Sequence, residues 1–226
     1  MKFLVYDTET TGLPQSKYVK MSLVDLWPHV VQFSYIIYDS ETNKLEKNDQ
    51  IIKIPENIIM SDENISLHGI TNEMSSSSGV SINNVIEEFL NSIEGVDLII
   101  GHNLEFDLNM LKIEIMRIIK DTTNEEIKKK YQEKLIKIDN YHKYYCTMKT
   151  TVDLCKLPSP YKKNKDQYKY PKLDELHNHL FGIKPLKLHN SLNDVIVTFR
   201  CFYKLKYDQD ICQINSDMEK TIKSLM

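Results

Sequence analysis

Two carboxylates stand close together near the start of the chain, in the stretch YDTETTG from Tyr6 to Gly12. Asp7 and Glu9 are two residues apart at the end of an apolar run, and alternate residues of a strand point to the same face of a sheet. Carboxylates on one face repel each other unless a cation lies between them or one of them stays protonated. A strand end with a solvated acidic turn is the better explanation of a lone D-x-E pair, so a cation site requires further acids.

Two other blocks also present acids where an element begins or ends. GHNLEFD, Gly101 to Asp107, follows the apolar run VDLII, and Asp107 falls in the first turn of the helix expected after it. HNSLND, His189 to Asp194, opens the last long amphipathic helix and leaves Asp194 at the rim of its apolar face. Acids from all three blocks can therefore meet at one end of a sheet.

In this order and spacing, the three blocks resemble the DEDDh branch of the DnaQ-like 3′–5′ exonuclease superfamily, which includes proofreading exonucleases similar to DNA polymerase III epsilon. DTETTG is similar to its first motif, GHNLEFD to its second, and His189 with Asp194, five residues later, to its third. Weaker similarities are LHGIT, YCTM and YPKLDEL…LFG, and the resemblance extends from Lys2 to about Lys206. The family often has alanine where this chain has Ser191 and Val195, a departure that we expect to matter little.

The resemblance implies a ribonuclease H-like α/β fold, a mixed central β-sheet flanked by helices, and a metal-dependent nuclease. Asp7, Glu9 and Asp194 would hold one ion, Asp7 would be shared with a second, and Asp107 would act on the second through water. Carboxylate oxygens suit Mg²⁺ or Mn²⁺, and two ions about 3.5–4 Å apart can stabilise the attacking and leaving oxygens. His189 would be the general base, because imidazole titrates near neutral pH.

The resemblance also implies where the 3′ end of a nucleic acid binds. Backbone groups around Thr10 and Thr11 would hold the terminal sugar, and the side chain of Leu13 would wedge against the last base. The expected substrate-binding residues are Thr10, Thr11, Gly12, Leu13, His102, Asn103 and Phe106. The products would be nucleoside 5′-monophosphates.

The choice of substrate stays open at this stage. Single-stranded DNA is slightly favoured over RNA, because the first motif and the HGIT block look more like the proofreading branch. An RNA-trimming exoribonuclease is one alternative, and contact with the 2′-OH would distinguish it. A non-catalytic nucleic-acid-binding accessory subunit of a polymerase is another, although all four acids and the histidine are intact. A polymerase partner, a role in replication or repair, and the oligomeric state are equally open.

The segment from Tyr161 to Lys172, YKKNKDQYKYPK, contains five lysines and three tyrosines. Lysines suit phosphates and tyrosines suit bases, so the segment could contact a single strand. A solvated lysine-rich loop explains it equally well.

The elements that must position these residues are indicated by apolar periodicity. The pattern predicts strands at 3–6, 30–38, 44–54 and 96–100, and helices at 82–93, 104–119, 124–138 and 192–202. Ser75 to Ser78 are interpreted as part of a connector. Strands followed by alternating strands and helices indicate a mixed α/β layer fold.

Chain length, charge and composition limit the number of domains and the location that we expect. The 226 residues predict one exonuclease domain over 1–226, with a core of about 1–206, a short C-terminal extension over 207–226 and a charged insertion near 121–144. The net charge of −3 excludes a global positive field. Four cysteines without C-x-x-C spacing, and no signal peptide or membrane span, predict a reducing cytoplasmic or nuclear location. The absence of alanine suggests a low-GC organism or a virus.

Overall fold

The computed structural model describes residues 1–16, 18–141, 143–159 and 168–226. Its centre is a five-stranded sheet with strand order β3-β2-β1-β4-β5. The strands are β1 (Lys2–Thr10), β2 (Val30–Asp39), β3 (Lys44–Ile51), β4 (Leu98–Gly101) and β5 (Tyr144–Cys146). β1 pairs antiparallel with β2 and parallel with β4, so the sheet is mixed, as predicted.

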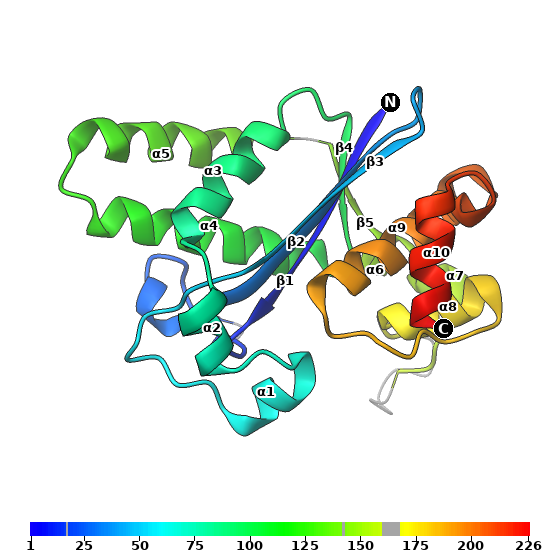
Figure 1. Cartoon of the computed structure of the whole chain (residues 1–226), viewed down its shortest axis with the longest axis horizontal. Coiled ribbons are helices and arrows are strands. Elements are labelled where there is room, and N and C mark those ends of the chain that lie inside the picture. The colour runs from blue at the N-terminus through cyan, green and yellow to red at the C-terminus, as the bar shows by residue number, and fades with distance from the viewer. Residues whose placement is uncertain (17, 142, 160–167) are drawn as a thin grey trace.

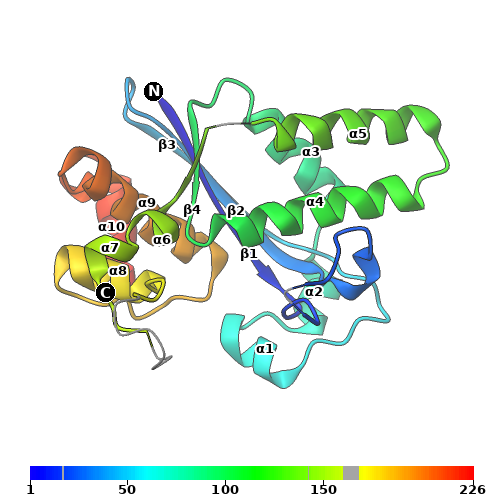
Figure 2. The ribbon, with the colours of Figure 1, turned by 180° about the vertical axis from the view of Figure 1, so that it is seen from behind.

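Helices cover both faces of this sheet (Figures 1 and 2). The α-helices are α1 (Asp62–His68), α2 (Asn72–Ser78), α3 (Ile82–Ser92), α4 (Leu104–Asp121), α5 (Glu125–Asp139), α6 (Thr147–Thr150), α7 (Val152–Cys155), α8 (Leu173–Phe181), α9 (Ser191–Tyr207) and α10 (Ser216–Leu225). Two 3₁₀ helices are η1 (Val24–Leu26) and η2 (Ile211–Gln213).

The alternation of side chains along β1 divides the core into two clusters. Phe3 and Val5 pack with α8, α9 and α10 on one face, and Leu4 and Tyr6 pack with α3, α4 and α5 on the other. This period of two is the geometry of a strand buried on both faces. Because β1 continues to Thr10, its odd-numbered residues stay on the α9 face beyond the apolar run.

Most of the predicted elements are present, and their ends differ by a few residues. β1 is longer than the expected strand at 3–6, because its polar residues from Asp7 onward still pair with β2. The prediction that Ser75 to Ser78 form a connector was wrong. They lie in α2, which Thr71 caps by accepting a hydrogen bond from the amide of Met74. The Ser75 hydroxyl is buried there and donates to the Ile52 carbonyl, 2.8 Å away.

Arg117 anchors the long connection between β1 and β2. Its guanidinium donates to the carbonyl oxygens of Val24, Trp27 and Pro28 at 2.7–3.1 Å, and it pairs with buried Glu114 at 2.7 Å. A planar cation with several donors suits a loop that exposes consecutive carbonyls. The contacts hold η1 and the start of β2 against α4.

The charged insertion forms α5, which packs along α4. Its apolar side chains Tyr131 and Ile138 are buried in the same cluster as α3 and α4. In the described residues, no helix is both long and apolar enough to cross a bilayer.

Candidate active site

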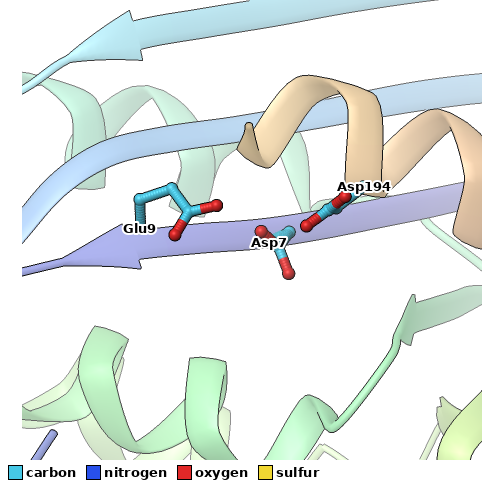
Figure 3. Close-up of side chains that lie close together, drawn as sticks. All are labelled: Asp7, Glu9 and Asp194. Atoms are coloured by element: carbon cyan, nitrogen blue, oxygen red, sulfur yellow. The ribbon is translucent and has the colours of Figure 1, made fainter. Parts of the chain in front are cut away.

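Asp7, Glu9 and Asp194 converge at one end of β1. One oxygen from each carboxylate lies within 4.8 Å of the others. Figure 3 shows Glu9 and Asp194 on either side of Asp7, with Asp194 projecting from the start of α9. The three acids that the sequence predicted to bind one ion are therefore neighbours in space, although the first and the last are 187 positions apart in the sequence.

The fold explains why these side chains meet. Asp7 and Glu9 continue the face of β1 on which Phe3 and Val5 pack against α9. Asp194 lies in the first turn of α9, where the Asn190 side chain caps the helix by accepting from the amide of Asn193. The packing of α9 on the sheet therefore brings its first turn over the acidic end of β1.

Burial and mutual repulsion make this cluster electrostatically unfavourable without a cation. Burial, and then the nearby Asp107, Asp194 and Glu9 charges, raise the pKa of Asp7 well above its usual range. Burial and the Glu9 charge do the same to the pKa of Asp194. Burial alone raises the pKa of Glu9 to about 7. Perturbed acids gathered at one place are typical of a functional site.

A divalent cation fits the donors that are present. The three residues offer hard carboxylate oxygens, which Mg²⁺ and Mn²⁺ prefer. Asp194 supplies the most direct observation: its Oδ1 is buried and has no hydrogen-bond partner among the residues that the structure describes. Its Oδ2 accepts from the backbone N–H of His189 at 3.3 Å. A buried carboxylate oxygen without a donor is suited to an ion.

Asp107 approaches the cluster from the opposite side of β1. It is buried in the first turn of α4, and its Oδ1 accepts from both the amide and the hydroxyl of Thr8, at 3.0 and 2.8 Å. Burial raises the pKa of Asp107 to about 8, although both Thr8 hydrogen bonds favour the ionised form. Asp107 lies outside the group formed by Asp7, Glu9 and Asp194, and its role on a second ion stays a prediction.

His189 differs from the acids in being exposed. Its backbone has φ 64°, a left-handed conformation that is uncommon for a residue other than glycine. Its imidazole makes no hydrogen bond to any residue in the described ranges. The loop therefore presents an accessible nitrogen at the start of α9, next to Asp194.

Comparison with known proteins places these features in a family. A family model described as Exonuclease matches residues 4–202. The chain belongs to this exonuclease family. The match confirms the resemblance to the DnaQ-like superfamily. A search of curated proteins finds no match for this exonuclease-family chain.

Solved structures show the same fold at low sequence identity. Exonuclease I of E. coli, in complex with a dT13 oligonucleotide, is 19% identical, with TM-score 0.61 over 94% of this chain and 42% of its own. Exonuclease I of Methylocaldum szegediense is 16% identical, with TM-score 0.58 over 92% and 41%. Cell-death related nuclease 4 is 12% identical, with TM-score 0.60 over 92% and 64%. The present chain thus spans less than half of the exonuclease I chains, and the ribonuclease H-like fold is confirmed.

The turn after β1 is where the family resemblance locates the 3′ end. Thr10 is buried, and its hydroxyl donates to the Gly12 carbonyl at 2.6 Å. The amide of Thr11 donates to His29, and its carbonyl accepts from Asn64 of α1 at 2.7 Å. The Thr11 amide is therefore already engaged within the protein, and the binding of the terminal sugar by backbone groups around Thr10 and Thr11 stays a prediction.

Gly12 and Leu13 complete this turn. Gly12 has φ 146°, and a Cβ atom there would lie 3.2 Å from the Asn64 amide nitrogen, so glycine suits both the backbone and the space. Leu13 is 80% exposed, which leaves its side chain accessible to a base.

Of the three residues expected to line the groove, only Asn103 is exposed. Its backbone is left-handed, with φ 64°, at the start of α4. The His102 ring contacts the Thr147 hydroxyl at 3.0 Å and the Pro171 carbonyl at 3.1 Å, and burial lowers its pKa to about 4. Phe106 packs against the α4 core cluster. Neutral His102 therefore ties the segment before α8 to the end of β4.

The lysine-rich segment is only partly described. Residues 160–167 lie outside the described ranges, so the single-strand contact predicted for Tyr161 to Lys172 remains a prediction. In the described part, exposed Tyr170 precedes Pro171, whose carbonyl contacts His102.

Several residues that shape the site were not identified from the sequence. Thr8 orients Asp107, Asn64 holds the turn after β1, and Gln32 contacts the start of α9. The available signal for Gln32 was a polar residue within the apolar run VVQFSYII. For Thr8 it was a hydroxyl residue between two acids.

Proposed function

We propose that this protein is a metal-dependent 3′–5′ exonuclease that releases nucleoside 5′-monophosphates from the 3′ end of a nucleic acid. The single observation that carries the proposal is the convergence of Asp7, Glu9 and Asp194, with an unpartnered Asp194 oxygen, at one end of β1. Membership of the exonuclease family and the position of His189 beside Asp194 support it.

In this mechanism the catalytic residues have separate tasks. Asp7, Glu9 and Asp194 would hold one cation, and Asp7 with Asp107 would serve a second. Two divalent cations, when bound, stabilise the attacking and leaving oxygens of the phosphodiester. His189 accepts the proton of the attacking water at its imidazole nitrogen, and its exposure lets that proton pass to solvent. Thr8 fixes the Asp107 carboxylate through two hydrogen bonds.

Single-stranded DNA is the proposed substrate. Exonuclease I, which shares this fold, has been crystallised with dA13, dA16 and dT13 oligonucleotides. Exposed Leu13 can contact a base without reading the 2′-OH. An exoribonuclease and a non-catalytic binding module are the two alternatives, and both have distinct outcomes in the experiment below.

The test is the degradation of 5′-labelled single-stranded DNA and of RNA with the same sequence. Wild type, Asp7→Ala and a control, Asp39→Ala, are assayed in Mg²⁺, Mn²⁺ and EDTA. Asp39 is a carboxylate at the opposite end of the sheet, paired with Lys2 in the register, so its loss removes a charge without touching the cluster. We expect wild type and the control to shorten DNA from the 3′ end, with no product in EDTA or from Asp7→Ala.

Other outcomes are informative. Faster degradation of RNA would replace the DNA assignment and keep the exonuclease. Retained single-strand affinity without turnover in either metal, from folded wild type, would refute the enzyme and favour the binding module.

A further inference from the structure

The acid cluster is assembled from two elements that do not share a hydrogen-bonded ladder. Asp7 and Glu9 belong to β1, whereas Asp194 belongs to α9. The separation of their carboxylates therefore depends on how the first turn of α9 is fixed against the sheet. A small shift of this helix would change the fit of a cation, because metal sites require their ligands within a few tenths of an ångström.

Ser191 joins α9 directly to the strand that carries Asp7. It is the first residue of α9 and is fully buried. Its hydroxyl donates to the backbone carbonyl of Asp7 at 2.8 Å. This contact holds the backbone of one carboxylate residue one helical turn away from the other. The exonuclease motif often has alanine here, so the hydroxyl adds a contact that alanine cannot make.

Gln32 provides a second link between α9 and the sheet. It lies opposite Glu9 in the β1–β2 register and is 3% exposed. Its Oε1 accepts from the backbone amide of Ser191 at 3.1 Å and from the side-chain Nδ2 of Asn190 at 3.4 Å. The amide of the first helical residue has no partner within its own helix, so this acceptor satisfies a group that burial would otherwise leave unpaired.

Asp49 of β3 determines which way the Gln32 amide points. Its Oδ1 accepts from Gln32 Nε2 at 2.8 Å and from the Ser34 hydroxyl at 2.7 Å. A carboxylate can only accept, so Nε2 must face Asp49 and Oε1 must face α9. The chain of contacts thus runs from β3 through β2 to α9 and β1.

We propose that Ser191 and Gln32, the latter oriented by Asp49, are positioning residues that set the separation of Asp7 and Asp194 and thereby the affinity for a divalent cation. The proposal rests on the proposed function, since it concerns the same cluster. None of these contacts uses the Asp7 or Asp194 carboxylate, so removing them leaves all the ligands in place and changes only their relative position.

The experiment compares Ser191→Ala with Ser75→Ala. Both serines are buried, and each hydroxyl donates to a backbone carbonyl, but Ser75 lies in α2 and its partner is Ile52 rather than Asp7. Mn²⁺ binding is measured by electron paramagnetic resonance without nucleic acid, at a temperature at which thermal unfolding shows every variant to be folded. Exonuclease activity is then measured as a function of Mn²⁺ concentration.

We expect Ser191→Ala to weaken Mn²⁺ binding about tenfold, in the range found for residues that support metal ligands, and Ser75→Ala to change it less than about twofold. Saturating Mn²⁺ should restore the activity of Ser191→Ala, because its ligands are intact. Gln32→Leu is a second variant with the same expectation.

Equal Mn²⁺ affinity in wild type, Ser191→Ala and Gln32→Leu would overturn the inference. A wild type that neither binds Mn²⁺ nor degrades nucleic acid would instead refute the proposed function. A loss of stability common to both serine variants, with unchanged affinity, would show that the network serves folding alone.

Discussion

The two parts of the candidate active site are built in opposite ways. The carboxylates lie on a strand and on the first turn of a helix, half-buried, and the side chains of Gln32 and Ser191 hold these two elements together. His189 lies on an exposed loop, with a left-handed backbone and an imidazole that makes no hydrogen bond within the described residues. This protein thus combines a rigid group of acids with an accessible histidine.

The difference follows from what each part has to do. Buried carboxylates repel one another and need a framework that holds them together until a cation binds. A general base exchanges protons with water, so it gains from exposure. The loop before His189 is held mainly by contacts near the end of α10: the amide of Leu186 donates to the Leu225 carbonyl, and Lys187 Nζ donates to the Ser224 carbonyl.

The largest effect is expected from Asp7→Asn. Loss of the central ligand should reduce kcat by about a thousandfold or more, since metal ions supply several kcal/mol of transition-state stabilisation. In EDTA the same variant should unfold at a higher temperature than wild type, because it removes a buried charge that its neighbours repel. Nuclease assays and thermal unfolding test both effects. If Asp7→Asn unfolded at a lower temperature than wild type in EDTA, the conclusion that the metal-free carboxylates repel one another would be wrong.

His189→Asn should reduce kcat about 10²–10⁴-fold, the usual contribution of a general base. Asparagine tolerates the left-handed backbone at this position, so the loop should keep its shape. Mn²⁺ affinity should match that of wild type, because His189 is outside the acid cluster. If His189→Asn lost Mn²⁺ binding as well, the conclusion that the histidine and the acid cluster act independently would be wrong.

Metal-free stability should fall as pH rises from about 6.5 to about 8. The pKa values of Glu9 and Asp107 are raised to about 7 and about 8, above those of the unfolded chain, so the folded state holds more protons in this window. The loss of these protons from Glu9 and Asp107 as the pH rises therefore destabilises the folded state. The buried histidines, whose pKa values are lowered, are neutral in the folded state throughout this window, and the unfolded chain loses its last histidine protons in the lower part of it, so the fall is clearest above about pH 7.

Urea unfolding in EDTA across this window measures the effect, and Mg²⁺ should reverse it at the upper end. A free energy of unfolding that rose with pH would contradict the raised pKa values. Glu9→Gln should flatten the dependence.

The smallest effect is expected from Lys187→Met, which removes the donor to the Ser224 carbonyl. Loss of one exposed hydrogen bond should lower kcat by at most about fivefold. Mn²⁺ affinity should stay unchanged, because the acid cluster is held by other contacts. Lys184→Met is the control, because Lys184 pairs with Asp174 rather than with α10. A change in KM with constant kcat would indicate a phosphate contact and contradict a positioning role.

The sequence by itself determined the main strands, the long helices and the three acids that meet. Asp7 and Glu9 could be assigned to one face of a strand, because the alternation of side chains along a strand is a local property. Asp194 could be placed at the rim of a helix, because it lies at the start of an amphipathic pattern. Short elements such as α1, α6 and α7 were missed, since their apolar periodicity is too brief to detect. The serine run was misread for the same reason.

The tertiary structure decided how the acids are supported. Asp107 reaches the site by way of Thr8, and Gln32 holds α9 through Ser191, whose hydroxyl the sequence comparison with the family had treated as unimportant. The exposure of His189 and the engagement of the Thr11 amide were equally invisible. The physical reason is that burial and hydrogen bonding between residues far apart in sequence depend on packing, whereas periodicity and motif spacing record only what neighbouring residues require.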